Sequence, residues 1–113
     1  MLEVKGLFHI NEPEKWPELL GNVRNLLTGI SEATELEVII VANGRGVQGY
    51  VSEEVLSGIE DLPKDVVTFK ACQNALNGQG IAKEDLVDRI QVVPAGVIEI
   101  INQQALGFSY IKP

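Results

Sequence analysis

The 113-residue chain contains one cysteine, Cys72, and one histidine, His9. A single cysteine cannot form a disulfide within the chain. Small secreted domains usually depend on several disulfides, so we expect a cytoplasmic protein. One cysteine and one histidine also fall short of the ligand set that a structural zinc ion requires, so we expect no metal site.

Positive charge and long apolar runs are scarce as well. The chain has 9 Lys and Arg against 16 Asp and Glu, which gives a net charge of −7. Nucleic acids and anionic membranes are bound by clustered lysine and arginine, so neither is an expected partner. No apolar run approaches the length that crosses a bilayer. The first residues do not have the pattern of a secretory signal, and we expect none.

The sequence lacks a Gly-x-x-x-x-Gly-Lys-Ser/Thr phosphate loop and a Gly-x-Ser-x-Gly nucleophile elbow. It does contain Gly-x-Gly-x-x-Gly at residues 44–49, after an apolar segment. A dinucleotide site also needs an acidic residue at the end of the next strand, where this chain has Lys70-Ala71-Cys72. We therefore expect a glycine-rich turn that binds neither NAD nor FAD, and no cofactor. Its N–H groups could instead hold a small anion.

Apolar segments alternate with helical patterns along a chain that fits one domain, residues 1–113. Strands are expected at 2–10, 35–42, 65–71, 89–93 and 108–111. Helical segments are expected at 16–30, 47–59, 72–76, 82–86 and 96–105, and residues 52–55 either interrupt the second of these or cap it anew. The segment 35–42 is apolar on both faces, which is typical of parallel sheets. The order predicts a three-layer α/β/α sandwich with a five-stranded, mostly parallel sheet.

In open α/β sheets, ligands bind at the carboxyl ends of the strands. The turns at those ends are residues 9–12, 42–46, 71–74 and 93–96. They contain the candidate binding residues His9, Asn11, Asn43, Gly44, Arg45, Asn74, Pro94 and Gly96. A histidine there can carry a proton or pair with a thiolate, although a structural role is equally open to it. The asparagines are equally explained as turn and cap formers.

Cys72 is the candidate catalytic residue because it lies between a predicted strand and a predicted helix. The free N–H groups and partial positive charge of a helix N-terminus favour a thiolate. The alternative is a core cysteine that packs as a small apolar side chain.

Five stretches of the chain, taken in order, resemble the DsrE/DsrF-like family, the small YchN-like proteins of sulfur metabolism. They are Phe8-His9-Ile10-Asn11-Glu12, Gly21-Asn22-Val23-Arg24-Asn25-Leu26-Leu27, Val41-Ala42-Asn43-Gly44, Ala71-Cys72-Gln73-Asn74-Ala75-Leu76 with Gly80-Ile81, and Val93-Pro94-Ala95-Gly96-Val97. The resemblance implies a parallel five-stranded sandwich that assembles as a trimer or hexamer. It also implies that Cys72 accepts and passes on persulfide sulfur. One departure is that residues 73–79 lack the basic side chains that often follow this cysteine in relay members.

Two functions follow as hypotheses. In the first, the protein is a sulfur carrier or sulfurtransferase whose partners are sulfur donor and acceptor thiol proteins or small persulfides. With no second cysteine, transfer would have to occur between molecules. In the second, it is a non-catalytic regulatory module that binds a small anion at residues 44–49, while Cys72 only packs. The apolar residues at 97–101 also favour a homo-oligomer.

Overall fold

The structure, a computed structural model, describes residues 3–30 and 35–113. In these residues five strands form one sheet in the order β4-β3-β2-β1-β5, and every neighbouring pair is parallel. The strands are β1 (Glu3–Ile10), β2 (Glu35–Ala42), β3 (Val67–Cys72), β4 (Ile90–Val93) and β5 (Ser109–Ile111).

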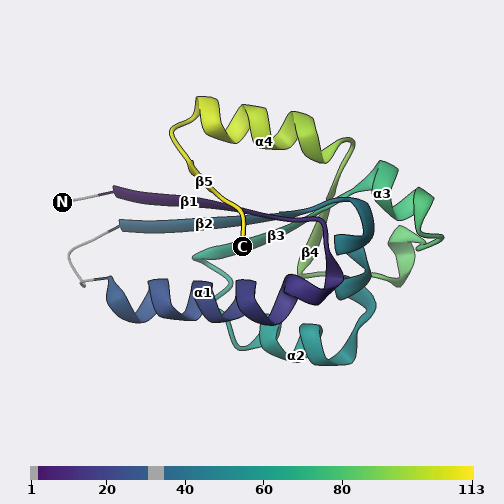
Figure 1. Ribbon diagram of the computed structural model, residues 1–113, viewed down its shortest axis with the longest axis horizontal. Coiled ribbons are helices and arrows are strands. Elements are labelled where there is room, and N and C mark those ends of the chain that lie inside the picture. The colour runs from purple at the N-terminus through teal and green to yellow at the C-terminus, as the bar shows by residue number, and fades with distance from the viewer. Residues whose placement is uncertain (1–2, 31–34) are drawn as a thin grey trace.

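Helices cover both faces of this sheet. The α-helices are α1 (Trp16–Gly29), α2 (Glu53–Glu60), α3 (Gln73–Gly78) and α4 (Gly96–Ala105). Short 3-10 helices are η1 (Pro13–Lys15), η2 (Gly44–Val51) and η3 (Lys83–Asp85). Figure 1 shows α4 on one face of the sheet, α1 and α2 on the other, and α3 beyond the carboxyl ends of the strands. The three-layer α/β/α sandwich predicted from the sequence is confirmed.

The two faces of the sheet are covered unequally. Side chains alternate along each strand, and one set, including Phe8, Ile40 and Phe69, packs with Trp16 and Leu19 in the main core. The opposite set forms a much smaller cluster of Leu7, Ile39, Val41 and Phe108, against which Ile100 of α4 packs. Strand β2 contributes to both clusters, as its apolar sequence predicted.

Several element boundaries differ from the sequence prediction. Residues 44–51 form η2, and the expected helix over 47–59 is wrong in its first part. Helix α2 begins only at Glu53, where the Ser52 hydroxyl accepts a hydrogen bond from the Val55 N–H at 3.5 Å. The sequence left open whether residues 52–55 interrupt a helix or cap a new one, and the structure shows that they cap a new one.

Strand β3 begins at Val67 and not at 65, and it extends through Cys72, which pairs with Val93 of β4. Cys72 is thus the last strand residue and not the first helical one. Smaller shifts occur elsewhere: α1 ends one residue early, and β4 and β5 each start one residue late. The expected start of the first strand at Leu2 lies outside the described residues.

The glycine-rich segment at residues 44–49 packs against the end of β1 and against Trp16 of α1. The Trp16 Nε1–H donates a hydrogen bond to the Gly46 carbonyl at 2.8 Å. A Cβ on Gly46 would lie 2.4 Å from the Ile10 carbonyl oxygen, and one on Gly49 would lie 2.1 Å from Trp16 Nε1. The second and third glycines of the Gly-x-Gly-x-x-Gly pattern are therefore required for close approach to β1 and α1.

We predict that Gly46→Ala lowers the free energy of unfolding by about 2 kcal/mol or more, because backbone atoms of Ile10 cannot move aside for the added methyl group. Gly78→Ala is the matched control, since its Cβ would meet nothing within 4 Å. It should stabilise the protein by up to about 1 kcal/mol. Urea unfolding followed by the fluorescence of the single tryptophan, at equal protein concentrations, measures both. If both substitutions changed the free energy of unfolding equally, Gly46 would not be required for close packing.

Candidate functional site

The carboxyl ends of β1, β2 and β3 bring Asn43 and Cys72 together. The register pairs Ala42 with Ala71, so the next residues on these adjacent strands are Asn43 and Cys72. Gly96, the first residue of α4, lies against both side chains. A Cβ on Gly96 would be 3.2 Å from the Asn43 Cβ and 3.3 Å from the Cys72 Cβ. The absence of a side chain at Gly96 therefore lets the first turn of α4 cover the pair closely.

Cys72 is nearly enclosed in this arrangement. The residue is 7% exposed and its backbone is extended, with φ −74° and ψ 121°, as it leaves β3. Helix α3, which follows it, has only six residues. The ten-residue α4 lies against Cys72 through Gly96. Little of the Cys72 side chain is therefore open to a partner molecule while the turn at Gly96 is in place.

His9 lies at the centre of a hydrogen-bond chain. Its Nε2 is 2.8 Å from the Asn43 Oδ1, and its Nδ1 is 2.6 Å from the Tyr110 hydroxyl oxygen. An amide oxygen can only accept, so Nε2 donates this hydrogen bond, and in the tautomer with its hydrogen on Nε2 the Nδ1 atom accepts from Tyr110. Partial burial raises the pKa of Tyr110, which keeps its hydroxyl a donor at neutral pH. Both ring nitrogens are occupied, so neither is left to bond to Cys72 directly.

A partly buried ion pair joins β3 to α4 beside the cysteine. Lys70 precedes Cys72 by two residues and is therefore on the same face of the sheet. Its ammonium group pairs with the Glu99 carboxylate, which also accepts from Gln103 Nε2 at 2.9 Å. Burial raises the pKa of Glu99, but the hydrogen bonds from Lys70 and Gln103 and the charge of Lys70 outweigh it, and the pKa is lowered. The Tyr50 hydroxyl donates to the Lys70 carbonyl at 2.9 Å.

Sequence reasoning did not identify Lys70 or Tyr110. The residues that follow Cys72 carry no cation, whereas the strand periodicity of two places Lys70, two residues before it, on the same face. Tyr110 is 101 residues from His9 in the sequence. The pairing of Leu7 with Tyr110 between β1 and β5 brings it close.

The remaining candidates lie on the surface. Arg45 is exposed and forms an ion pair with Glu14 at 3.3 Å. Asn11 accepts from Lys112 Nζ at 3.1 Å. The others are Asn74 and Pro94, which are exposed, and Gly44, which has the positive φ of +52° that favours glycine. Of the predicted residues, the structure thus gathers His9, Asn43, Cys72 and Gly96 into one site.

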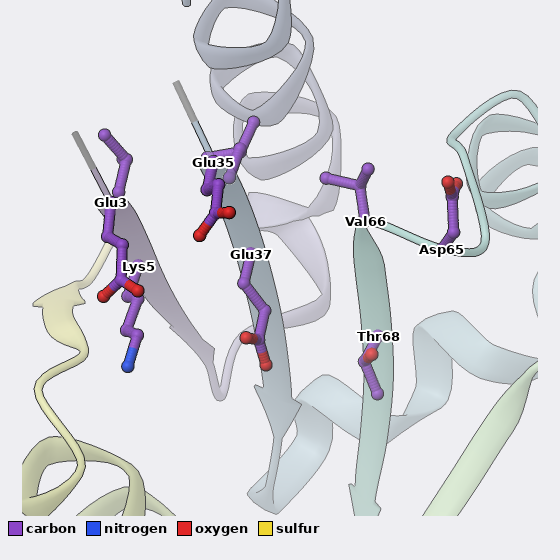
Figure 2. Close-up of a pocket in the computed structure, with 9 residues that line it drawn as sticks. Glu3, Lys5, Glu35, Glu37, Asp65, Val66 and Thr68 are labelled. Atoms are coloured by element: carbon purple, nitrogen blue, oxygen red, sulfur yellow. The ribbon is translucent and has the colours of Figure 1, made fainter. Parts of the chain in front are cut away.

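A hollow of about 290 Å³ lies at the opposite, amino-terminal edge of the sheet. Figure 2 shows the acidic side chains of Glu3, Glu35, Glu37 and Asp65 around it, with Lys5 and Thr68. No three His, Cys, Asp or Glu side chains are arranged to hold a metal ion anywhere in residues 3–30 and 35–113. In the same ranges, no helix has the length and apolar character needed to cross a membrane.

An all-parallel sheet in the order β4-β3-β2-β1-β5, with helices on both faces, places the protein among small three-layer α/β proteins. No protein-family profile and no curated protein matches the sequence. Among solved structures, the chain is similar to MTH1491 from Methanobacterium thermoautotrophicum, a protein of unknown function. Identity is 30%, each chain is covered in full and the TM-score is 0.80.

The chain is also similar to the ychN protein of E. coli, with 16% identity, full coverage of both chains and a TM-score of 0.74. The chain therefore belongs to the same family as MTH1491 and has the YchN-like, DsrE-like fold. The fold that the resemblance in the sequence implied is thereby confirmed.

We predict that Glu99→Gln lowers the free energy of unfolding at pH 7 by about 1 kcal/mol, because it leaves the partly buried Lys70 ammonium without its counter-charge. The folded-state pKa of Glu99 lies below its ordinary value of 4.5. The stabilisation is therefore complete above that value and is lost as the pH falls through the folded-state pKa. Urea unfolding at neutral and acidic pH should show parent and variant converging in acid.

Glu18→Gln is the control for this prediction, because Glu18 belongs to an exposed pair with Lys15 at 3.7 Å. Exposed pairs contribute little, and this substitution should change the stability by less than about 0.5 kcal/mol. A Glu99→Gln difference that persists unchanged in acid would show that packing, and not charge, is responsible.

Proposed function

We propose that this protein is a cytosolic persulfide carrier that holds sulfur on Cys72. The observation that carries the proposal is the position of this cysteine at the carboxyl edge of the sheet, beside Asn43 and the first turn of α4. The YchN-like fold and the resemblance of the sequence to the DsrE/DsrF-like family support it. Ligand sites of open α/β sheets lie at this edge.

The chemistry requires only thiol groups. The Cys72 thiolate attacks the outer sulfur of a donor persulfide, R–S–SH. The new Cys72 S–S bond forms as the S–S bond of the donor breaks, and the donor leaves as the thiolate R–S⁻. An acceptor thiolate then attacks the outer sulfur of the Cys72 persulfide, and Cys72 leaves as a thiolate. Because Cys72 is the only cysteine, the donor and acceptor are other molecules, either thiol proteins or small persulfides and thiols.

The packing of residues 44–49 favours this function over the small-anion module. Gly46 and Gly49 approach the main chain of Ile10 and the indole of Trp16. The Gly46 N–H already donates to the Asn43 carbonyl at 3.0 Å. Arg45, the cation of the loop, is paired with Glu14. Little of the loop's capacity to bind an anion is therefore left free.

We predict that iodoacetamide modifies Cys72 in the folded protein at neutral pH. We also predict that incubation with a small-molecule persulfide adds the mass of one sulfur atom, detected by intact mass spectrometry. Cys72→Ser is the control and should gain no sulfur. Modification of Cys72 only after unfolding would assign it to the core and end the carrier proposal. Ready alkylation with no sulfur gain from any donor would favour the anion-binding module.

The exposed face of α4 supports assembly of the carrier as a homo-oligomer. Three side chains of α4 and the residue that follows it are each exposed by 59% or more: Val97, Ile98, Ile101 and Leu106. A hollow of about 270 Å³ beside them is lined by His9, Val97, Ile100, Ile101, Gln104 and Tyr110. Contiguous apolar surface of this kind is typical of protein interfaces. We therefore propose a trimer or hexamer in which this face lies at the subunit boundary, near the Cys72 edge.

Light scattering at micromolar concentration should give the mass of a trimer or hexamer for the parent protein, and Ile101→Glu should reduce it to that of the monomer. A charge placed in an apolar interface must lose its hydration, which is costly. Val87→Glu is the matched control, since Val87 is also exposed but lies outside α4. A monomer mass for the parent protein would overturn this assembly.

A further inference from the structure

The hydrogen-bond chain at the carboxyl edge has a direction. The Tyr110 hydroxyl donates to His9 Nδ1, and His9 Nε2–H donates to Asn43 Oδ1. Each hydrogen bond is thus donated from the β5 side of the sheet toward β2. Successive hydrogen bonds with the same direction polarise one another, and such a chain favours negative charge at its final donor. The final donor here is the Asn43 amide N–H₂.

The position of that amide follows from the order of the strands. Asn43 follows β2, which lies between β1 and β3. Its oxygen is the partner of His9 on β1, and β3, which ends at Cys72, is the neighbour of β2 on the other side. Among the described residues, neither the Cys72 thiol nor any other group accepts a hydrogen bond from the amide nitrogen in this structure, so this donor is free. Gly96 contributes no side chain that would separate Asn43 from Cys72.

We propose that the Asn43 amide donates a hydrogen bond to the anionic sulfur on Cys72, and that His9 and Tyr110 are positioning residues that hold this amide. The anionic sulfur is the thiolate before loading and the outer sulfur of the persulfide after it. The inference rests on the proposed carrier function and identifies what this site recognises. Hydrogen bonds to a charged acceptor are stronger than neutral ones.

The charged groups around Cys72 leave this role to a neutral donor. From β3, Lys70 is on the same face as the thiol, but its charge is paired with Glu99 of α4. From β1 and β5, His9 and Tyr110 face Asn43 and bond to each other. Arg45 is directed to Glu14 on the surface. Among the side chains named here, the amide of Asn43 is therefore the neutral one with free donor capacity, beside the main-chain N–H groups of the first turn of α4.

The test is a pH titration of the Cys72 thiolate by its ultraviolet absorbance, which requires neither access to the thiol nor sulfur transfer. Each variant is corrected with its Cys72→Ser counterpart. In Asn43→Ala the midpoint should rise by about half to one pH unit, which corresponds to roughly three- to tenfold less thiolate at neutral pH. Tyr110→Phe should give a smaller rise. In the double variant, Tyr110→Phe should not raise the midpoint beyond that of Asn43→Ala, because Tyr110 acts through Asn43.

Asn74→Ala is the matched control, because Asn74 is an exposed asparagine two residues after Cys72. Its midpoint should equal that of the parent. The Asn43 side chain does not cap η2, and Tyr110 is 41% exposed, so both variants should fold, which circular dichroism checks. Equal midpoints in Asn43→Ala and Asn74→Ala would overturn the donor role of Asn43. A Tyr110→Phe shift that persists in the Asn43→Ala background would overturn the positioning role of Tyr110.

Sulfur loading, measured on the same variants by intact mass, separates this inference from the proposed function. If the parent gains sulfur while all midpoints coincide, the carrier function stands and the role of Asn43 fails. If the parent never gains sulfur but the midpoints shift as expected, the carrier function fails and Asn43 is a donor to the thiolate alone.

Discussion

The insertion of Trp16 beneath the η2 segment is the contact on which the carboxyl edge of the sheet depends. Its indole N–H donates to the Gly46 carbonyl, and its ring meets Gly49 so closely that no side chain fits there. The ring also packs edge-on against Tyr50 with centroids 5.2 Å apart, and Tyr50 donates to the Lys70 carbonyl. One buried side chain on α1 thus ties together the turn after β2 and the end of β3. Asn43 and Cys72 lie at those two positions.

This arrangement explains how a site forms with few charged groups. The side chains next to Cys72 are an amide and a lysine whose charge is paired with Glu99. Free cations would strongly stabilise a thiolate and so make it less basic. It would then also be a weaker nucleophile, because the nucleophilicity of a thiolate decreases as its basicity decreases. A neutral donor stabilises the anion to a smaller degree. Such a balance would suit the proposed carrier, whose sulfur is taken up and then released to another thiol.

The sequence predicted features that depend on local pattern. Strand β2 was predicted with the bounds 35–42 that the structure has, because a run of β-branched residues gives a clear signal. The main part of α1 followed from the spacing of its apolar residues. Cys72 was correctly placed at the junction of β3 and α3.

Features set by contacts between distant segments were not predicted. An α-helix was expected to begin at residue 47, within η2, because nothing local reveals that Gly46 must approach Ile10 or that Gly49 must approach Trp16. The bond between His9 and Tyr110 depends on the pairing of the first and last strands. The motif at 44–49 resembles a ligand loop for the same reason, because glycines needed for internal packing and for ligand approach look alike in a sequence.

Because the two faces of the sheet are covered unequally, the helices on the two faces should detach with different free energies. The α1 and α2 side is anchored by a large aromatic and aliphatic core, whereas α4 is held by the small cluster around Leu7 and by the Lys70–Glu99 pair. Regions with few buried apolar contacts open with a smaller free energy than the whole domain. Detachment of α4 alone would thus leave the rest of the sheet intact. It would also lift Gly96 from Cys72, so the solvent exposure of the thiol is coupled to the opening equilibrium of a single helix.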